Sequence, residues 1–139
     1  MQIAVTGHCL ITGGAGAMGA ATARLAARNG YAVSLVSLEA ERASAEALVR
    51  EIAEGGGAAS FVSADVSSES DVVEAYRTAA ETFGPPTGVL HAAGTFVGDM
   101  VRDLNFEAIS RLLAVNVTGL MICCREAARL MSTRSGGPG

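Results

Sequence analysis

Along the chain, short continuous apolar runs alternate with segments whose apolar residues lie three and four positions apart. This pattern indicates strands separated by helices. Short apolar runs rich in β-branched residues predict four buried strands, at residues 9–12, 31–36, 58–64 and 89–91. Apolar residues spaced three and four apart predict four helices, at residues 17–28, 39–54, 69–83 and 105–131.

This alternation, with short connections, predicts right-handed crossovers and a parallel sheet that has helices on both faces. The expected fold class is therefore α/β, a doubly wound, Rossmann-like, three-layer sheet with strand order 3-2-1-4. The first and fourth strands flank the point where the order reverses, so their carboxyl ends, at Thr12-Gly13 and His91-Ala92, should border the ligand crevice. The chain is expected to form one domain over residues 1–139, with residues 1–7 as a lead-in and residues 135–139 as a linker.

The connection between the first strand and the first helix has the spacing Gly14-x-Gly16-x-x-Gly19. Small residues at this spacing allow a tight turn, close approach of backbone N–H groups to a pyrophosphate, and close packing of the helix on its strand. The free N–H groups and the positive dipole end of the helix would then face the anion. A strand before and a second strand after the motif favour dinucleotide binding over a plain glycine turn.

Composition excludes several classes of function. The net charge of -4 and the isoelectric point near 5.1 argue against binding to nucleic acid or acidic lipid, which requires a basic surface. Three cysteines, two of them adjacent, match neither a disulfide framework nor a zinc site, so no metal is expected. Residues 1–23 carry no charged side chain, but their glycines and the lack of a basic start argue against a signal or membrane segment. We expect a cytoplasmic protein without a membrane partner.

Four motifs together resemble the short-chain dehydrogenase/reductase family over nearly the whole chain: the glycine loop, Asp65-Val66, residues 89–94 and Val115-Asn116-Val117-Thr118-Gly119. The resemblance implies NAD or NADP as cofactor and places Asn116 in a catalytic Asn-Ser-Tyr-Lys set. It also implies a cofactor site made of Thr12, Gly13, Gly14, Gly16, Ala17, Met18 and Gly19 at the phosphates, Ser37 and Leu38 after the second strand, Asp65 and Val66 at the adenine, and His91, Ala92, Ala93 and Gly94 near the ribose.

Some positions depart from the main pattern of that family. Ala17 stands where the middle glycine is expected, and His91-Ala92 replaces two asparagines. Both departures resemble the extended branch, which includes nucleotide-sugar epimerases and dehydratases. The long helix after the second strand, the turn at residues 64–67 and the segment at residues 125–127 resemble the main dehydrogenase branch, which we favour.

The catalytic groups that the family carries after the long helix are absent from these residues. No lysine occurs, and Tyr31 and Tyr76 are followed four residues later by Leu35 and Ala80. The chain therefore resembles the cofactor-binding half of an oxidoreductase, truncated before the fifth strand, and we expect it to be inactive alone.

The leading hypothesis is an NAD(P)-dependent oxidoreductase that moves hydride between the nicotinamide and an alcohol or carbonyl carbon of a small molecule. The alternatives are an epimerase or dehydratase of the extended branch and a non-catalytic dinucleotide-binding module. The family's usual acid is missing at Ser37 and no arginine stands at Leu38, which predicts a slight preference for NADP. The long helix at residues 105–131 is apolar on more than one side and predicts a homo-oligomer, a dimer or tetramer.

Several of these residues also have a purely structural interpretation. Asn116 could be a polar residue that bridges elements, His91 a structural histidine at a strand end, and Asp65 the acceptor of a turn. Glu39, about 20 residues after the glycines, could accept ribose hydroxyls or favour the first turn of its helix.

Overall fold

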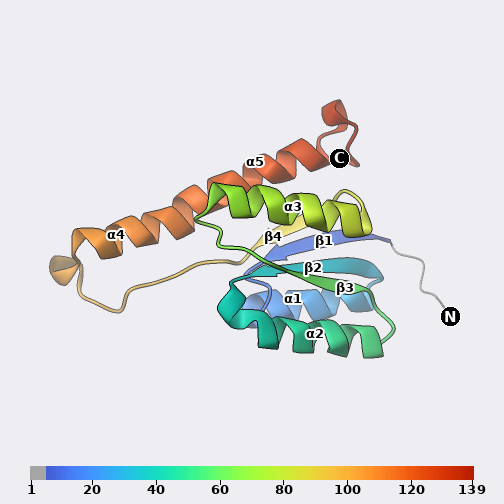
Figure 1. Ribbon diagram of the computed structural model, residues 1–139, viewed down its shortest axis with the longest axis horizontal. Helices are drawn as coiled ribbons and strands as arrows, with labels where there is room; N and C mark the ends of the chain where they lie inside the picture. The colour runs from blue at the N-terminus through green and yellow to red at the C-terminus, as the bar shows by residue number, and fades with distance from the viewer. Residues whose placement is uncertain (1–5) are drawn as a thin grey trace.

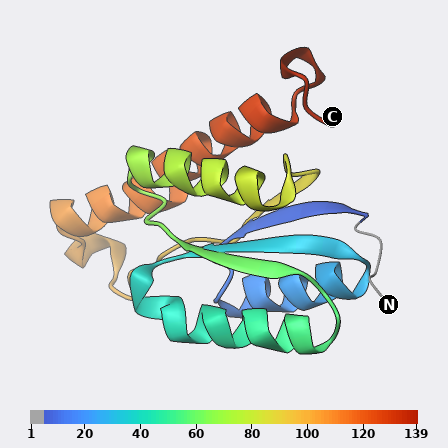
Figure 2. The same cartoon turned by 45° about the vertical axis from the view of Figure 1, so that its right-hand side comes forward.

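The computed structural model describes residues 6–139 and contains a parallel four-stranded sheet in the order β3-β2-β1-β4 (Figure 1). Its strands are β1 Gly7–Thr12, β2 Tyr31–Ser37, β3 Ala59–Ser63 and β4 Gly88–His91. Helices α1 (Ala17–Arg28) and α2 (Arg42–Glu54) cover one face of the sheet, and α3 (Glu69–Phe83) and α5 (Leu120–Met131) cover the other (Figures 1 and 2). The doubly wound, three-layer fold predicted from the sequence is confirmed.

Two hydrophobic clusters fill the space between the sheet and its helices. Successive residues of a strand point to opposite faces, so Leu10 packs on the α3–α5 side while Ile11 packs on the α1–α2 side. Val36 and Leu35 of β2 divide in the same way. All four side chains are at most 1% exposed, which explains why the strands read as continuous apolar runs rather than alternating ones.

The first strand begins earlier than the apolar run suggests. Gly7 and His8 already pair with Tyr31 and Ala32, so Gly7 belongs to β1 and not to a lead-in; residues 1–5 of the expected lead-in lie outside the described residues. His8 hides this strand start because it is polar, yet it is buried with both ring nitrogens satisfied. Nδ1 lies 2.8 Å from the carbonyl oxygen of Gly84, and Nε2 lies 2.9 Å from Oγ of Ser34.

The segment expected to be a linker folds back on the end of α5. A 3₁₀ helix, η4, spans Thr133–Ser135, the N–H of Gly137 donates to the Ser132 carbonyl at 2.9 Å, and the N–H of Gly139 donates to the Met131 carbonyl at 2.8 Å. Glycines permit this tight reversal, so a composition that is typical of linkers here forms a helix-terminal turn.

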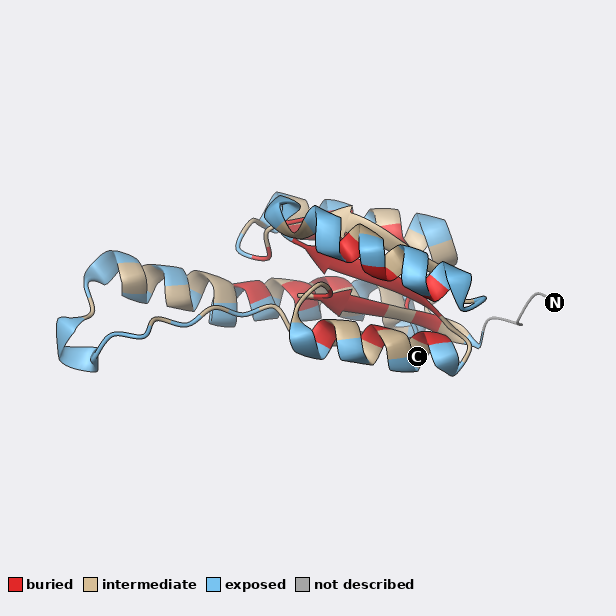
Figure 3. Cartoon of the chain, turned by 90° about the horizontal axis from the view of Figure 1, so that it is seen from below, coloured by how far each residue is buried: buried red, intermediate tan, exposed pale blue. Residues whose placement is uncertain are grey.

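The predicted helix at residues 105–131 is continuous but changes its pitch. It consists of α4 (Phe106–Leu113), a π-helical segment η3 (Ala114–Gly119) and α5. The connector at residues 92–105, which includes the 3₁₀ turn η2 (Val101–Asp103), runs beside α4, and both project beyond the end of the sheet (Figure 3). We call residues 92–119 the arm.

The helix Phe106–Met131 is long and apolar enough to cross a membrane by length and composition, and 11% of its most apolar window is buried. Core helices of water-soluble proteins meet the same criteria when a partner covers them. The finding therefore shows a long apolar helix that the other described residues cover only in part.

The second helix starts later than expected. Glu39–Glu41 forms a 3₁₀ turn, η1, and α2 begins at Arg42. This turn lies where β2 ends, so its side chains stand beside the carboxyl edge of the sheet.

Candidate functional site

The loop between β1 and α1 can be formed only with glycine at two positions. Gly13 has a φ of +65°, and a Cβ on it would lie 2.6 Å from the backbone nitrogen of Ala93. A Cβ on Gly19 would lie 2.2 Å from the carbonyl oxygen of Gly13. Any side chain at either position would force β1, β4 or α1 apart, so the glycine spacing is a requirement of this packing.

The start of α1 presents uncapped N–H groups. The cap residue is Gly16, which has no side chain to bond them, and no acidic residue occupies the first turn. The first N–H groups of a helix have no acceptor within the helix and carry the positive end of its dipole. The residues present thus fit a pyrophosphate group, whose oxygens would accept from these N–H groups.

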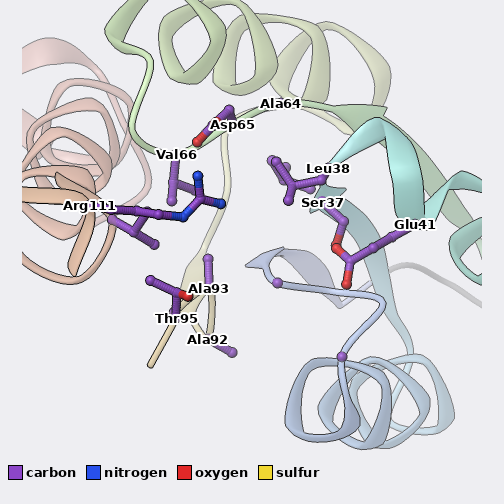
Figure 4. A pocket seen from close by; sticks show the side chains of 15 residues that line it. Ser37, Leu38, Glu41, Ala64, Asp65, Val66, Ala92, Ala93, Thr95 and Arg111 are labelled. Carbon is purple, nitrogen blue, oxygen red and sulfur yellow. The ribbon is translucent and has the colours of Figure 1, made fainter. Parts of the chain in front are cut away.

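A cleft opens beside this loop at the carboxyl ends of the four strands (Figure 4). It brings together the following predicted residues: Gly13, Gly16, Ser37, Leu38, Asp65, Val66, Ala92, Ala93 and Gly94. The other predicted residues, which do not line this cleft, are Thr12, Gly14, Ala17, Met18, Gly19, His91 and Asn116.

Ser37 connects the cleft to the glycine loop. Its side chain is buried at 4% exposure, and its Oγ accepts a hydrogen bond from the N–H of Ala15 at 3.1 Å. The hydroxyl therefore fixes the loop against the end of β2. The sequence does not predict this bond, because it indicates Ser37 only as a residue of the implied cofactor site that lacks the family's usual acid.

Asp65 has the structural role that its position at a strand end suggests, and it also lines the cleft. Its Oδ1 accepts from the N–H of Ser67 at 2.9 Å and from the Ser67 hydroxyl at 2.7 Å. This turn holds Asp65 and Val66 at the wall of the cleft. Adenine contact by these residues stays a prediction.

His91 does not line the cleft and bonds to β1. Its Nδ1 is 2.8 Å from Oγ1 of Thr12, and that oxygen also accepts from the N–H of Ala93 at 3.5 Å. Burial lowers the pKa of His91, so the ring is neutral near pH 7. His91 thus joins the carboxyl ends of β1 and β4 and does not line the cleft, and its Nε2 is buried without a hydrogen-bond partner among the described residues.

Asn116, in the π-helical segment, holds the arm together. Its Oδ1 accepts from the N–H of Thr95 at 2.9 Å, and its Nδ2 donates to the carbonyl oxygen of Thr95 at 2.7 Å. Both ends of the amide are therefore engaged with the connector, as expected for a residue that bridges elements. Its neighbour Val115 and its partner Thr95 line the cleft, so Asn116 shapes the cleft through them. Its membership of a catalytic set stays a prediction.

Glu41, Thr95 and Arg111 line the cleft and were missed by sequence reasoning. Glu41 lies four residues after Ser37, and Arg111 lies five residues before Asn116. Their closeness in sequence to predicted site residues is the feature that could have pointed to them. Glu39, which was considered instead, is exposed and paired with Arg42 at 2.8 Å, outside the cleft.

Within residues 6–139, no group of three or more His, Cys, Asp or Glu side chains could hold a metal ion. The polar groups of the cleft are hydroxyls, separate carboxylates and one guanidinium, which suit an organic ligand with phosphate groups better than a metal.

Comparison with known proteins assigns the family. The profile of the family described as short chain dehydrogenase matches residues 7–138. An uncharacterized oxidoreductase, YgfF of Escherichia coli, is 37% identical over 131 residues, which cover 94% of this chain and 53% of that protein. The 2-(S)-hydroxypropyl-CoM dehydrogenase 3 of Xanthobacter autotrophicus is 35% identical over 127 residues, which cover 91% of this chain and 49% of that protein.

Solved structures agree with this assignment. A dehydrogenase/reductase from Sinorhizobium meliloti superimposes with a TM-score of 0.86 at 28% identity, over 92% of this chain and 51% of that one. A short-chain dehydrogenase/reductase from Serratia marcescens gives a TM-score of 0.85 at 27% identity, over 93% of this chain and 52% of that one. The chain belongs to the short-chain dehydrogenase/reductase family, and it spans about half the length of the relatives it matches.

Proposed function

We propose that this chain is the dinucleotide-binding portion of an NAD(P)-dependent oxidoreductase that interconverts an alcohol and a carbonyl group on a small molecule. The observation that carries this proposal is the uncapped start of α1 beside a cleft lined by β-strand ends. When bound, the dinucleotide would supply or accept the hydride. The loop N–H groups would hold its phosphates, Asp65 and Val66 its adenine, and Ala93 and Gly94 its ribose.

The proposal is tested by calorimetric titration of the chain with NADH. Replacing Gly13 by Val places a side chain against Ala93 and requires a φ that valine rarely adopts, so the variant should bind far more weakly. Gly98→Val is the matched control, because a Cβ on Gly98 meets nothing within 4 Å. Equal affinity of folded wild-type and Gly13→Val proteins would contradict the proposal.

The choice between NAD and NADP is a finer question. Ser37 carries no charge that would repel a 2′-phosphate, and Leu38 provides no cation that would bind one. These two residues considered alone favour NADP slightly, and this preference stays a prediction about that pair.

We expect the 139 residues to bind cofactor without turning over substrate. In this family a lysine lowers the pKa of the tyrosine that passes the proton, and the 139 residues contain no lysine. A panel of carbonyl substrates with NADH or NADPH should therefore show no cofactor oxidation. Turnover at rates typical of intact enzymes would contradict this expectation.

We also propose that the arm and α5 pair with a second copy in a cytoplasmic protein. The exposed apolar side chains that support this are Phe106, Leu113, Val117, Leu120 and Met121. Light scattering should show a dimer or tetramer, and Val117→Arg should shift it toward the monomer because an arginine would be desolvated in the contact. A strictly monomeric wild-type protein at high concentration would remove this part of the proposal.

The other candidate classes have weaker support. The relatives named above carry oxidoreductase and dehydrogenase names, which favours the main branch over an epimerase or dehydratase despite Ala17. A non-catalytic dinucleotide-binding module predicts the same binding, and only turnover by a protein that includes the tyrosine and lysine separates it from the oxidoreductase.

A further inference from the structure

The wall of the cleft beside the end of β2 carries an unexpected negative charge. Glu41, in the 3₁₀ turn η1, is half-buried and lines the cleft together with Ser37 and Leu38. Figure 4 shows its carboxylate beside the side chain of Ser37 and directed toward the cleft. The acid that the sequence lacks at Ser37 is therefore supplied by a residue four positions later.

Ser37 itself is poorly placed to take this role. It is almost fully buried, and its hydroxyl is engaged with the N–H of Ala15 in the glycine loop. Leu38 has no polar side-chain atom. Of these three neighbours on the wall, only Glu41 presents a charged group to the cleft.

The nearby cation faces away from the cleft. Arg42 follows Glu41 directly, but its guanidinium donates to Glu39 at 2.8 Å and to Glu46 at 3.0 Å, and it lies 5.1 Å from the centre of the Phe61 ring. Arg42 does not line the cleft, so it is not positioned to bind a 2′-phosphate there.

The cation that does line the cleft stands on another wall. Arg111 comes from α4 and lies near Asp65 and Val66, across the cleft from Glu41 and Ser37 (Figure 4). The two walls therefore differ in charge, with a carboxylate beside the end of β2 and a guanidinium beside the turn after β3.

We infer that Glu41 is the residue that determines cofactor choice and that it favours NAD over NADP. This inference rests on the proposed function. A carboxylate at this wall accepts hydrogen bonds from the adenosine ribose hydroxyls of NAD, and it repels the additional phosphate of NADP. Glu41 thereby reverses the slight NADP preference that Ser37 and Leu38 give by themselves.

The test is a calorimetric titration of the chain with NAD and with NADP, so that it needs no catalytic activity. The wild-type protein should bind NAD more tightly. Glu41→Gln removes the charge while retaining the length of the side chain, and it should shift the ratio of the two dissociation constants toward NADP by about tenfold, as expected for removing one repulsion between charges a few ångströms apart.

Glu39→Gln is the matched control, because it makes the same change two residues away on the side facing Arg42. The control should leave the ratio unchanged. An unchanged ratio in Glu41→Gln, with both dinucleotides still bound, would overturn the inference and leave the proposed function standing. Failure of the wild-type protein to bind either dinucleotide would overturn both.

Discussion

The body of the molecule, residues 6–91 and 120–139, and the arm, residues 92–119, use apolar residues in opposite ways. In the body, Leu10 is 0% exposed between the sheet and its helices. In the arm, Leu113 is 54% and Phe106 is 83% exposed. The helical part of the arm is nevertheless regular: Asn105 caps α4 by accepting from the N–H of Ala108 at 2.8 Å, and Asn116 binds the connector.

This difference shows that periodicity and burial are separate properties. The spacing of apolar residues produces a helix in both regions, but a helix buries its apolar face only where another element lies against it. Most apolar faces of the body find these partners within the described residues, while Leu120 and Met121 at the start of α5 stay exposed. The arm extends past the sheet, so its apolar face is available to a second copy or to further chain.

The same substitution should have unequal effects on stability in the two regions. Leu10→Ala should lower the free energy of unfolding by about 2–5 kcal/mol, because it leaves a cavity in a closed core. Leu113→Ala should change it by less than about 0.5 kcal/mol in the monomer. Urea unfolding at low protein concentration measures both values, and equal losses would show that the arm is packed as the body is.

The body should also lose stability in mild acid. Burial lowers the pKa of His8 from 6.5, so below that pH the unfolded chain binds a proton that the folded chain does not. Stability is fully present above the unfolded pKa of 6.5 and is lost as pH falls below it. One such group gives a slope of at most about 1.4 kcal/mol per pH unit.

Urea unfolding between pH 7.5 and 5.5 checks this slope. His8→Gln removes the titrating ring and should flatten the dependence even where it lowers stability at neutral pH. A slope that is the same in His8→Gln and wild-type proteins would assign the effect elsewhere, with His91 as the other histidine whose pKa burial lowers.

A smaller effect is expected within the arm. Asn116→Ala removes two exposed hydrogen bonds to Thr95 and should cost about 1 kcal/mol. Hydrogen exchange should accelerate at the backbone amides of the connector, residues 92–105. Asn105→Ala, which removes only the cap of α4, should leave the Thr95 amide protected. Unchanged exchange in Asn116→Ala would show that these bonds do not hold the arm.

Much of the body was predictable from the sequence because its strands are short apolar runs between helices with clear end signals. The strand order followed from connection length and handedness. The start of β1 was missed because His8 is polar, and only the structure shows that Gly84 and Ser34 satisfy it. The glycine loop was predictable because close contacts, such as that between Gly19 and Gly13, require glycine at these positions.

The walls of the cleft were harder to predict because they depend on tertiary placement. Glu41 and Glu39 have the same chemistry two residues apart, and the direction of each side chain follows from the 3₁₀ turn and from the position of Arg42. Arg111 reaches the cleft because the long helix passes the turn after β3. The π-helical pitch around Asn116 left no signal in the apolar spacing.

If the start of α1 binds the phosphates of a dinucleotide, Gly16→Asp should weaken that binding while the protein stays folded. Gly16 has an ordinary cap conformation with φ -73° and ψ 169°. Aspartate is a preferred cap residue, so the variant should fold, with a small shift of the Gly13 carbonyl oxygen, which lies 3.3 Å from a Cβ on Gly16. Its carboxylate would nevertheless stand at the helix start that we propose binds the phosphates. Gly98→Asp adds the same charge in the arm.

The measurement is the dissociation constant for NADH, by calorimetry, of wild-type, Gly16→Asp and Gly98→Asp proteins with matched melting curves. Gly16→Asp should bind at least about tenfold more weakly, as expected for one repulsion at short range, and Gly98→Asp should bind as the wild type does. A folded Gly16→Asp protein that binds NADH with wild-type affinity would show that the start of α1 does not hold the phosphates.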